Sequence, residues 1–186
     1  GALTLWPGTQ GGAPLVLPSG KFMLLFALTW GTSLLVLVFF PRRYSSRSAV
    51  FLILGLSFAA RILLLPHPAS DDIYRYLWEG RVFLSGLNPY LLPPDAPQLA
   101  GLAATDPYQS LVNHPGLGAI YPPAMILLFA AVGQALYTPL AIKLVVIGFD
   151  MGTLGLLLLL LSRQHLPLRY SLLYALNPVI LYSFAG

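Results

Sequence analysis

Long apolar runs, separated by short polar turns, make up most of this chain. An α-helix needs about 20 apolar residues to cross ~30 Å of hydrocarbon. The runs that predict such spans are 22–40, 49–65, 122–137, 140–161 and 170–186, the last of them broken at Asn177-Pro178. They leave one long polar segment, 66–121. The pattern therefore predicts an all-α fold: a single membrane domain over 1–186, built as a polytopic helix bundle with one long loop.

Within that loop, residues 70–90 read SDDIYRYLWEGRVFLSGLNPY and have helical periodicity. Ser70 is placed to cap a helix over 72–85, and Gly86 is placed to end it. At 100° per residue a narrow polar stripe carries Asp72, Arg75 and Glu79, and apolar side chains cover most of the remaining surface. An amphipathic helix that includes Trp78 suits the membrane–water boundary. We therefore expect it to lie roughly parallel to the bilayer, with Trp78 facing lipid or the bundle.

Charge sets the expected orientation of the loop. Arginines concentrate in the turn at 42–47, which the positive-inside rule places in the cytoplasm. Five of the six acids fall in 66–121, which we expect outside. Plain alternation then places Arg163 and Arg169 outside, against the rule. A re-entrant 122–137 would return them to the cytoplasm. We favour plain alternation with a short span, because the apolar run is continuous.

Composition supports the membrane prediction and excludes other classes. Hydrophobic residues make up 57% of the chain, charged residues make up 9%, and the mean hydropathy is +0.77. An average soluble domain carries about 25% charge. The net charge of +4 comes from scattered residues, which does not indicate a nucleic-acid partner. The chain has no cysteine, hence no disulfide and no thiol nucleophile. Because it begins with Gly and stops within an apolar run, we expect it to be a piece of a longer protein, inactive by itself.

The residues best suited to catalysis or binding lie at the start of the predicted surface helix. Asp71 and Asp72 are placed either to cap that helix or to act as a general base just outside the bilayer. Arg75 is placed either to pair with Asp72, one turn away, or to hold a phosphate. Arg61 is placed to snorkel or to hold the same phosphate.

Two further sets of ionisable residues have a structural and a functional interpretation. Lys143 and Asp150 lie within a predicted span, where charges are costly and frequently functional. We favour a mutual or cross-helix pairing that holds the bundle together. His114 lies near the return of the loop to the membrane. A divalent metal site formed by His114, Asp71 and Asp72 stays an open alternative, although no ligand spacing requires one.

The motifs of residues 61–186 resemble those of the GT-C glycosyltransferases, membrane enzymes that use polyprenyl-phosphate sugars. The matching residues are Asp72-x-x-Arg75, Gly80, Asn88-Pro89-Tyr90 and Tyr121-Pro122-Pro123. The chain is most similar to bacterial polyprenol-phosphate-mannose-dependent mannosyltransferases. It departs from a D-x-D spacing because its two acids are adjacent.

The resemblance implies a hexosyl transfer, of mannose by the nearest similarity, from a polyprenyl-phosphate donor to a lipid or glycan acceptor. It implies the outer face of a bacterial inner (plasma) membrane, with membrane lipids as neighbours. Asp72 would be the base and Asp71 the alternative, while Arg75 or Arg61 would bind the donor phosphate. The substrate-binding residues we expect around them are Glu79, Asn88, Tyr90, His114 and Tyr121. The alternative function is a transporter or flippase of a lipid-linked or anionic substrate, with Lys143 and Asp150 as its working residues.

Overall fold

The structure is a computed structural model that describes residues 19–40, 46–67 and 69–185. These residues form eight α-helices and no strand, which confirms the all-α prediction. The loop expected over 1–20 lies almost entirely outside the described residues, as do Arg42 and Arg43.

The chain divides into two compact units, and each is described by itself. The bundle unit comprises the described residues of Leu15–Pro68 and Val146–Gly186, and the loop unit comprises Ala69–Val145. One long helix, α6 (Pro139–Arg163), contributes its first turns to the loop unit and the rest to the bundle unit.

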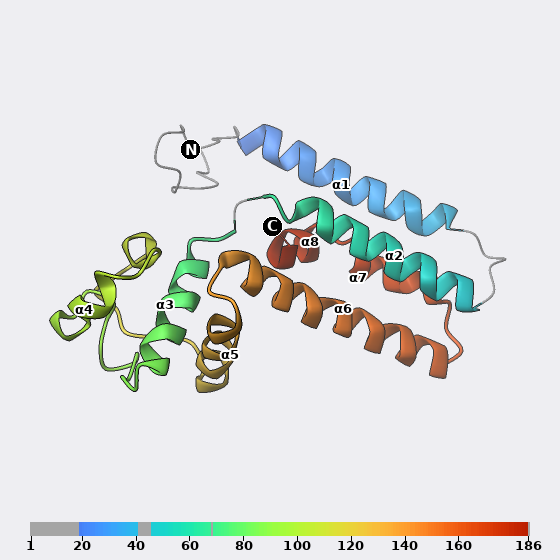
Figure 1. Ribbon diagram of the computed structural model, residues 1–186. Coiled ribbons are helices and arrows are strands. Elements are labelled where there is room, and N and C mark those ends of the chain that lie inside the picture. The colour runs from blue at the N-terminus through green and yellow to red at the C-terminus, as the bar shows by residue number, and fades with distance from the viewer. Residues whose placement is uncertain (1–18, 41–45, 68, 186) are drawn as a thin grey trace. The chain divides into compact units, whose positions relative to one another are not determined.

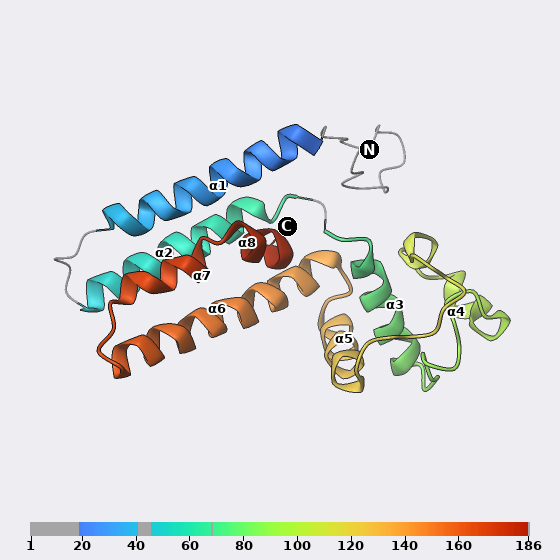
Figure 2. The same ribbon diagram turned by 180° about the vertical axis from the view of Figure 1, so that it is seen from behind.

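Three long helices and one interrupted helix make up the bundle unit (Figure 1). They are α1 (Ser19–Phe39), α2 (Ser46–Leu64), α6, and the sequence of η3 (Leu168–Ser171), α7 (Leu172–Ala175) and α8 (Pro178–Ala185). Seen from behind, α7 lies in front of α2 (Figure 2). The core is formed by Ile53, Leu154, Leu158, Leu172 and Ala175. The helix bounds lie within a few residues of the runs at 22–40, 49–65 and 140–161.

The interruption expected at Asn177-Pro178 is present. Helix α7 ends at Ala175, and α8 starts at Pro178, a residue suited to the first helical position because it has no N–H to leave unpaired. The Asn177 side-chain oxygen accepts a hydrogen bond from the Val179 N–H at 2.9 Å. The predicted run 170–186 is therefore two short helices and not one continuous helix.

Helices α2 and α6 run in opposite directions. Arg61, near the end of α2, contacts Asp150 in the first half of α6, whereas Ile53 packs with Leu154 and Leu158 further along α6. The chain therefore leaves the bundle unit and returns to it at the same end. A crossing at 122–137 would have made α2 and α6 parallel. Their direction fits the re-entrant alternative and not plain alternation.

The loop unit is built around α3 (Asp72–Leu84), which packs against α5 (Pro123–Ala135). Short helices η1 (Pro97–Leu99), α4 (Ala100–Ala103) and η2 (Gln109–Leu111) form the segment between them. The helix predicted over 72–85 is confirmed to within one residue. Gly86 ends it with φ +76°, and the N–H groups of Gly86 and Leu87 donate to the carbonyls of Phe83 and Val82. That pattern is the Schellman motif, which favours glycine at the left-handed position.

The expectation that Trp78 faces lipid or the bundle needs correction. Trp78 is buried, and it packs against Val82, Ala96, Leu99 and Val112 of the loop unit itself. The polar stripe is buried as well, because Arg75 and Glu79 face other parts of the loop. A helical wheel assigns faces by residue type and does not show which segment covers each face. Here residues 95–112 cover the Trp78 side.

Gly80 is the residue that lets α3 and α5 approach closely. A Cβ added there would lie 2.7 Å from the carbonyl carbon of Phe129 and 2.8 Å from the backbone nitrogen of Ala130. Since backbone atoms cannot rotate away, a side chain at this position would force the helices apart.

We therefore expect Gly80→Ala to lower the stability of the loop unit by about 1–3 kcal/mol, as overpacking does. Gly101→Ala is the matched control, because nothing lies within 4 Å of a Cβ at Gly101. Thermal unfolding in detergent measures both variants. Equal unfolding midpoints for Gly80→Ala and the parent would contradict this account of the contact.

Candidate functional site

The first turn of α3 presents a carboxylate held by a neighbouring amide. Asp72 is half-buried, and its Oδ1 accepts a hydrogen bond from Asn113 Nδ2 at 2.7 Å. The Asp72 N–H lies 3.4 Å from Ser70 Oγ, the expected cap residue. Asp71 occupies the N-cap position without a side-chain capping bond. A carboxylate at a helix N-terminus is stabilised by the helix dipole. The Asn113 contact distinguishes Asp72 from Asp71.

Asn113 belongs to a short segment, 113–118, that we call the strap. Arg75 holds the strap from inside the loop unit: its Nη1 donates to the carbonyls of Asn113 and His114 at 3.0 and 3.2 Å. Its Nη2 donates to the carbonyls of Leu117 and Gly118. Four backbone carbonyls of one segment therefore converge on a single guanidinium.

The remaining N–H of Arg75 donates to Glu79. The Nε–Oε1 distance is 2.7 Å, and the two side chains are 3% and 2% exposed. Neither of two predicted roles fits this geometry. All five N–H groups of Arg75 are engaged by described residues, so the expected phosphate-binding role and the expected pairing with Asp72 both need correction. Glu79, expected to bind substrate, is the buried partner of Arg75.

The strap contains a strained residue. His114 is exposed and has φ +45°, a left-handed conformation that is uncommon for residues other than glycine. Its carbonyl accepts hydrogen bonds from Arg75 and from the Leu117 N–H. Strained backbone persists where surrounding contacts determine it, and it is frequent at functional sites. The expected substrate role of His114 stays a prediction.

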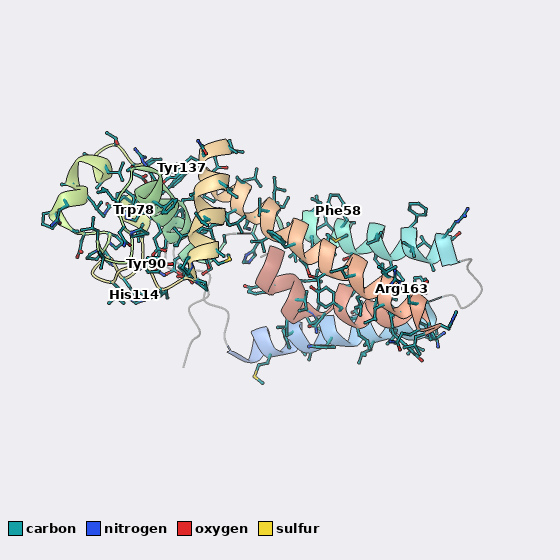
Figure 3. All side chains as sticks on the ribbon, turned by 90° about the horizontal axis from the view of Figure 1, so that it is seen from below. Phe58, Trp78, Tyr90, His114, Tyr137 and Arg163 are labelled. Carbon is teal, nitrogen blue, oxygen red and sulfur yellow. The ribbon has the colours of Figure 1, made fainter. Side chains whose placement is uncertain are left out.

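A second segment, 87–91, runs beside the strap. The Ala119 N–H donates to the Pro89 carbonyl at 2.8 Å, and a Cβ at Gly118 would lie 2.7 Å from the Tyr90 carbonyl oxygen. Asn88 Oδ1 accepts from the Tyr90 N–H at 2.9 Å and so fixes the turn. In the view of Figure 3, Tyr90 and His114 both fall at one edge of the loop unit. The predicted residues Asn88 and Tyr90 are thus brought next to the strap, and their substrate role stays a prediction.

Aromatic rings connect this region to α5. Tyr76 stacks on Phe129 with centroids 4.5 Å apart, and Tyr121 meets Tyr76 edge-on at 5.0 Å. The Tyr90 hydroxyl donates to the Tyr121 carbonyl. Tyr121, expected to bind substrate, is therefore part of the packing between α3 and α5.

Burial dominates the electrostatics around α3. Desolvation raises the pKa of the Glu79 carboxyl above its ordinary value, although Arg75 acts in the opposite direction. Burial likewise raises the pKa of the Tyr76 and Tyr121 hydroxyls, helped by the carboxylates of Asp72 and Glu79. These two phenols stay protonated at neutral pH and are suited to donating hydrogen bonds.

Arg81 lies on the side of α3 away from the polar stripe. Its Nη1 donates to Asp106 Oδ2 at 2.7 Å, and its Nη2 donates to Thr105. Asp106 also accepts from the Tyr137 hydroxyl at 2.7 Å. This group closes the loop over the last turns of α3.

Arg61 lies in the bundle unit, where it is completely buried. Its Nε donates to Asp150 Oδ2, and its Nη1 donates to the carbonyls of Ser57 and Ala175 at 3.0 Å. Asp150 also accepts from the Tyr174 hydroxyl at 2.7 Å. The cross-helix pairing expected of Asp150 is therefore present, and Arg61 is a partner in it. The phosphate role of Arg61 stays a prediction.

Sequence reasoning missed Asn113 as a member of the site. Asparagine is common in loops, and nothing in the spacing between Asp72 and Asn113 indicates their contact. Within the residues that the structure describes, no group of three or more His, Asp or Glu side chains is placed to hold a metal ion. Asp71, Asp72 and His114 are thus not brought together as a ligand set.

Comparison of the chain with protein-family models, with curated proteins and with solved structures finds no match.

Proposed function

We propose that this chain is part of a membrane-embedded glycosyltransferase that takes a hexose from a polyprenyl-phosphate donor. The half-buried carboxylate of Asp72, oriented by Asn113 at 2.7 Å, carries the proposal. The motif resemblance to GT-C enzymes supports the reaction class, and mannose is the sugar that it favours. The acceptor would be a lipid or a glycan.

Uncovered apolar surface supports membrane embedding. Two described helices, Arg47–Leu64 and Pro139–Arg163, are long and apolar enough to cross a membrane. Only 22% of the apolar stretch in each of them is buried. The core helix of a soluble protein would be mostly covered. Large side chains such as Phe51, Phe58, Leu63, Phe149 and Leu156 are exposed on these helices. Soluble proteins rarely expose apolar surface on this scale.

The antiparallel α2 and α6 support a simple topology. If both cross the bilayer, 65–138 leaves and returns on one face, and α5 does not cross. Arg47, Arg163 and Arg169 then share the opposite face, in agreement with the positive-inside rule. The loop unit would lie outside, as the resemblance requires for a lipid-phosphate donor.

We expect a cysteine at Ala104 to react with a membrane-impermeant thiol reagent from outside intact cells, and a cysteine at Gln164 to react only after the membrane is opened. The chain has no native cysteine, so each label reports one position. Ala104 and Gln164 are both exposed. If Gln164 reacted from outside, α5 would have to cross the membrane, and the topology derived from α2 and α6 would fail.

In the proposed reaction, the acceptor hydroxyl oxygen attacks the anomeric carbon of the donor. Its proton passes to the Asp72 carboxylate as the new glycosidic bond forms. The bond from the anomeric carbon to the phosphate oxygen breaks, and its electron pair leaves with polyprenyl phosphate. Attack opposite the leaving group inverts the anomeric configuration. The phosphate role expected of Arg61, whose Nη2 has no partner among the described residues, stays a prediction.

The test is transfer of radiolabelled mannose from polyprenyl-phosphate-mannose by the full-length protein in proteoliposomes. The proposal expects the label to move to an acceptor and free polyprenyl phosphate to appear in equal amount. Movement of intact donor between leaflets, without cleavage, would instead support the transporter. The contacts of Asp150 argue against the transporter, because Arg61 and Tyr174 already engage the carboxylate that would have to bind substrate.

A further inference from the structure

The loop unit has an apolar edge formed by two adjacent turns, 87–91 and 117–120, which we call the apolar lip. Leu91, Leu117 and Ile120 project from it and are 76%, 58% and 74% exposed. The Ala119–Pro89 hydrogen bond and the close approach of Gly118 to Tyr90 join the two turns. The exposed side chains therefore stand on two turns that are held against each other.

The interior of the loop unit fixes this surface. Arg75 holds the carbonyls of Leu117 and Gly118, and its buried pairing with Glu79 fixes the guanidinium. The Tyr90 hydroxyl donates to the Tyr121 carbonyl, which ties the lip to the start of α5. Buried polar contacts thus hold the backbone so that large apolar side chains point away from the core. Exposing these apolar side chains to water is unfavourable, so the surface is suited to contact with an apolar partner.

The sequence around the lip indicates which partner. No Asp, Glu, Lys, Arg or His occurs in 82–94 or in 115–142, the two stretches that carry the lip. The residues between them, 95–114, carry Asp95, Asp106 and His114. The two turns of the lip offer no charge of their own to a protein partner, although the exposed Asp95 carboxylate lies beside the strap, 3.7 Å from a Cβ placed at Gly116. Hydrocarbon with neighbouring tyrosines is the composition of the membrane interface.

The helix that follows the lip in the chain adds exposed apolar surface to the loop unit. Ile120 is followed closely by α5. α5 is itself apolar, and its Leu127 side chain is 55% exposed.

We propose that the apolar lip inserts into the outer leaflet of the bilayer, so that Leu91, Leu117 and Ile120 contact lipid acyl chains. The proposal rests on the membrane embedding part of the proposed function and is independent of the transfer chemistry. It replaces the Trp78 side of α3, which the loop unit itself covers, with the lip as the surface by which the loop unit meets the membrane. It also places Asp72, through Asn113 on the strap, beside that contact.

Site-directed spin labelling tests the proposal in the full-length protein. Single cysteines replace Leu91, Ile120, Ala104 or Phe58, carry a nitroxide, and are reconstituted in vesicles of phosphatidylcholine and phosphatidylglycerol. Collision with oxygen, which concentrates in lipid, is compared with collision with a water-soluble nickel chelate. We expect the oxygen-to-nickel ratio at Leu91 and Ile120 to be severalfold higher than at Ala104 and to approach the ratio at Phe58 on α2.

Each other outcome overturns the proposal. Nickel-dominated collisions at Leu91 and Ile120 would place the lip in water. Low collision with both reagents would mean that protein covers it, either another part of the polypeptide or a second copy. A water-exposed Phe58 would instead contradict membrane embedding itself, so the two failures are distinguishable. Unfolding midpoints equal to the parent's establish that each labelled variant is folded.

Discussion

Replacing Asp72 by Asn is expected to lower the rate of sugar transfer by ~10²–10⁴-fold, the usual contribution of a general base. Asparagine keeps the size of the side chain and keeps its carbonyl oxygen available to Asn113. It cannot take a proton from the acceptor hydroxyl. Donor binding and the unfolding midpoint should therefore stay close to those of the parent. Transfer is measured in proteoliposomes, and donor binding is measured on the same preparation.

Asp71→Asn is the matched control, since it removes one neighbouring carboxylate from the same turn. Asp71 lacks the Asn113 contact, and we expect its variant to keep a rate of the same order as the parent's. The transporter alternative predicts the reverse: Asp72 dispensable, and Lys143 or Asp150 critical. If both aspartate variants transfer at the parental rate, the base is not in this turn. The resemblance would then reflect shared architecture without shared chemistry.

The elements of this fold were predictable because they depend on local patterns. Apolar runs predict the long helices, Gly86 predicts the end of α3, and Asn177-Pro178 predicts the interruption in the last run. Each of these signals acts within a few residues of its effect. Helix direction was not predictable in the same way. The run at 122–137 is as apolar as a span. Contacts between distant residues, Arg61 with Asp150 and Ile53 with Leu154 and Leu158, show that α2 and α6 are antiparallel.

The site was predictable in composition and not in its contacts. Asp72 contacts Asn113 of the strap and Tyr90 lies against Gly118, while the roles expected of these residues stay predictions. The role of Arg75 was misjudged because its partners are backbone carbonyls 38 to 43 residues away. Carbonyls are present at every residue, so no sequence pattern marks the ones that a guanidinium will bind. Asn113 was missed for the related reason that its partner lies 41 residues away.

Replacing Arg75 by Ala is therefore expected to destabilise the loop unit. Removing one partner of a buried ion pair typically costs ~3–5 kcal/mol, because the other charge is left uncompensated. Glu79 is that charge here, and its Oε2 already has no partner among the described residues. Four strap carbonyls would lose their donor as well. Thermal unfolding in detergent should show a clearly lower midpoint. Arg163→Ala, at an exposed position in the bundle unit, should leave it unchanged.

A double variant separates the two contributions of Arg75. Arg75→Ala with Glu79→Gln removes the uncompensated charge but not the loss of the strap's donor. We expect it to recover part of the stability and not all of it. The competing hypothesis, that Arg75 binds the donor phosphate, predicts a different result. Arg75→Ala would then unfold at the parental temperature and bind the polyprenyl-phosphate donor more weakly. A normal midpoint together with weak donor binding would thus restore the phosphate role that the hydrogen bonds of Arg75 argue against.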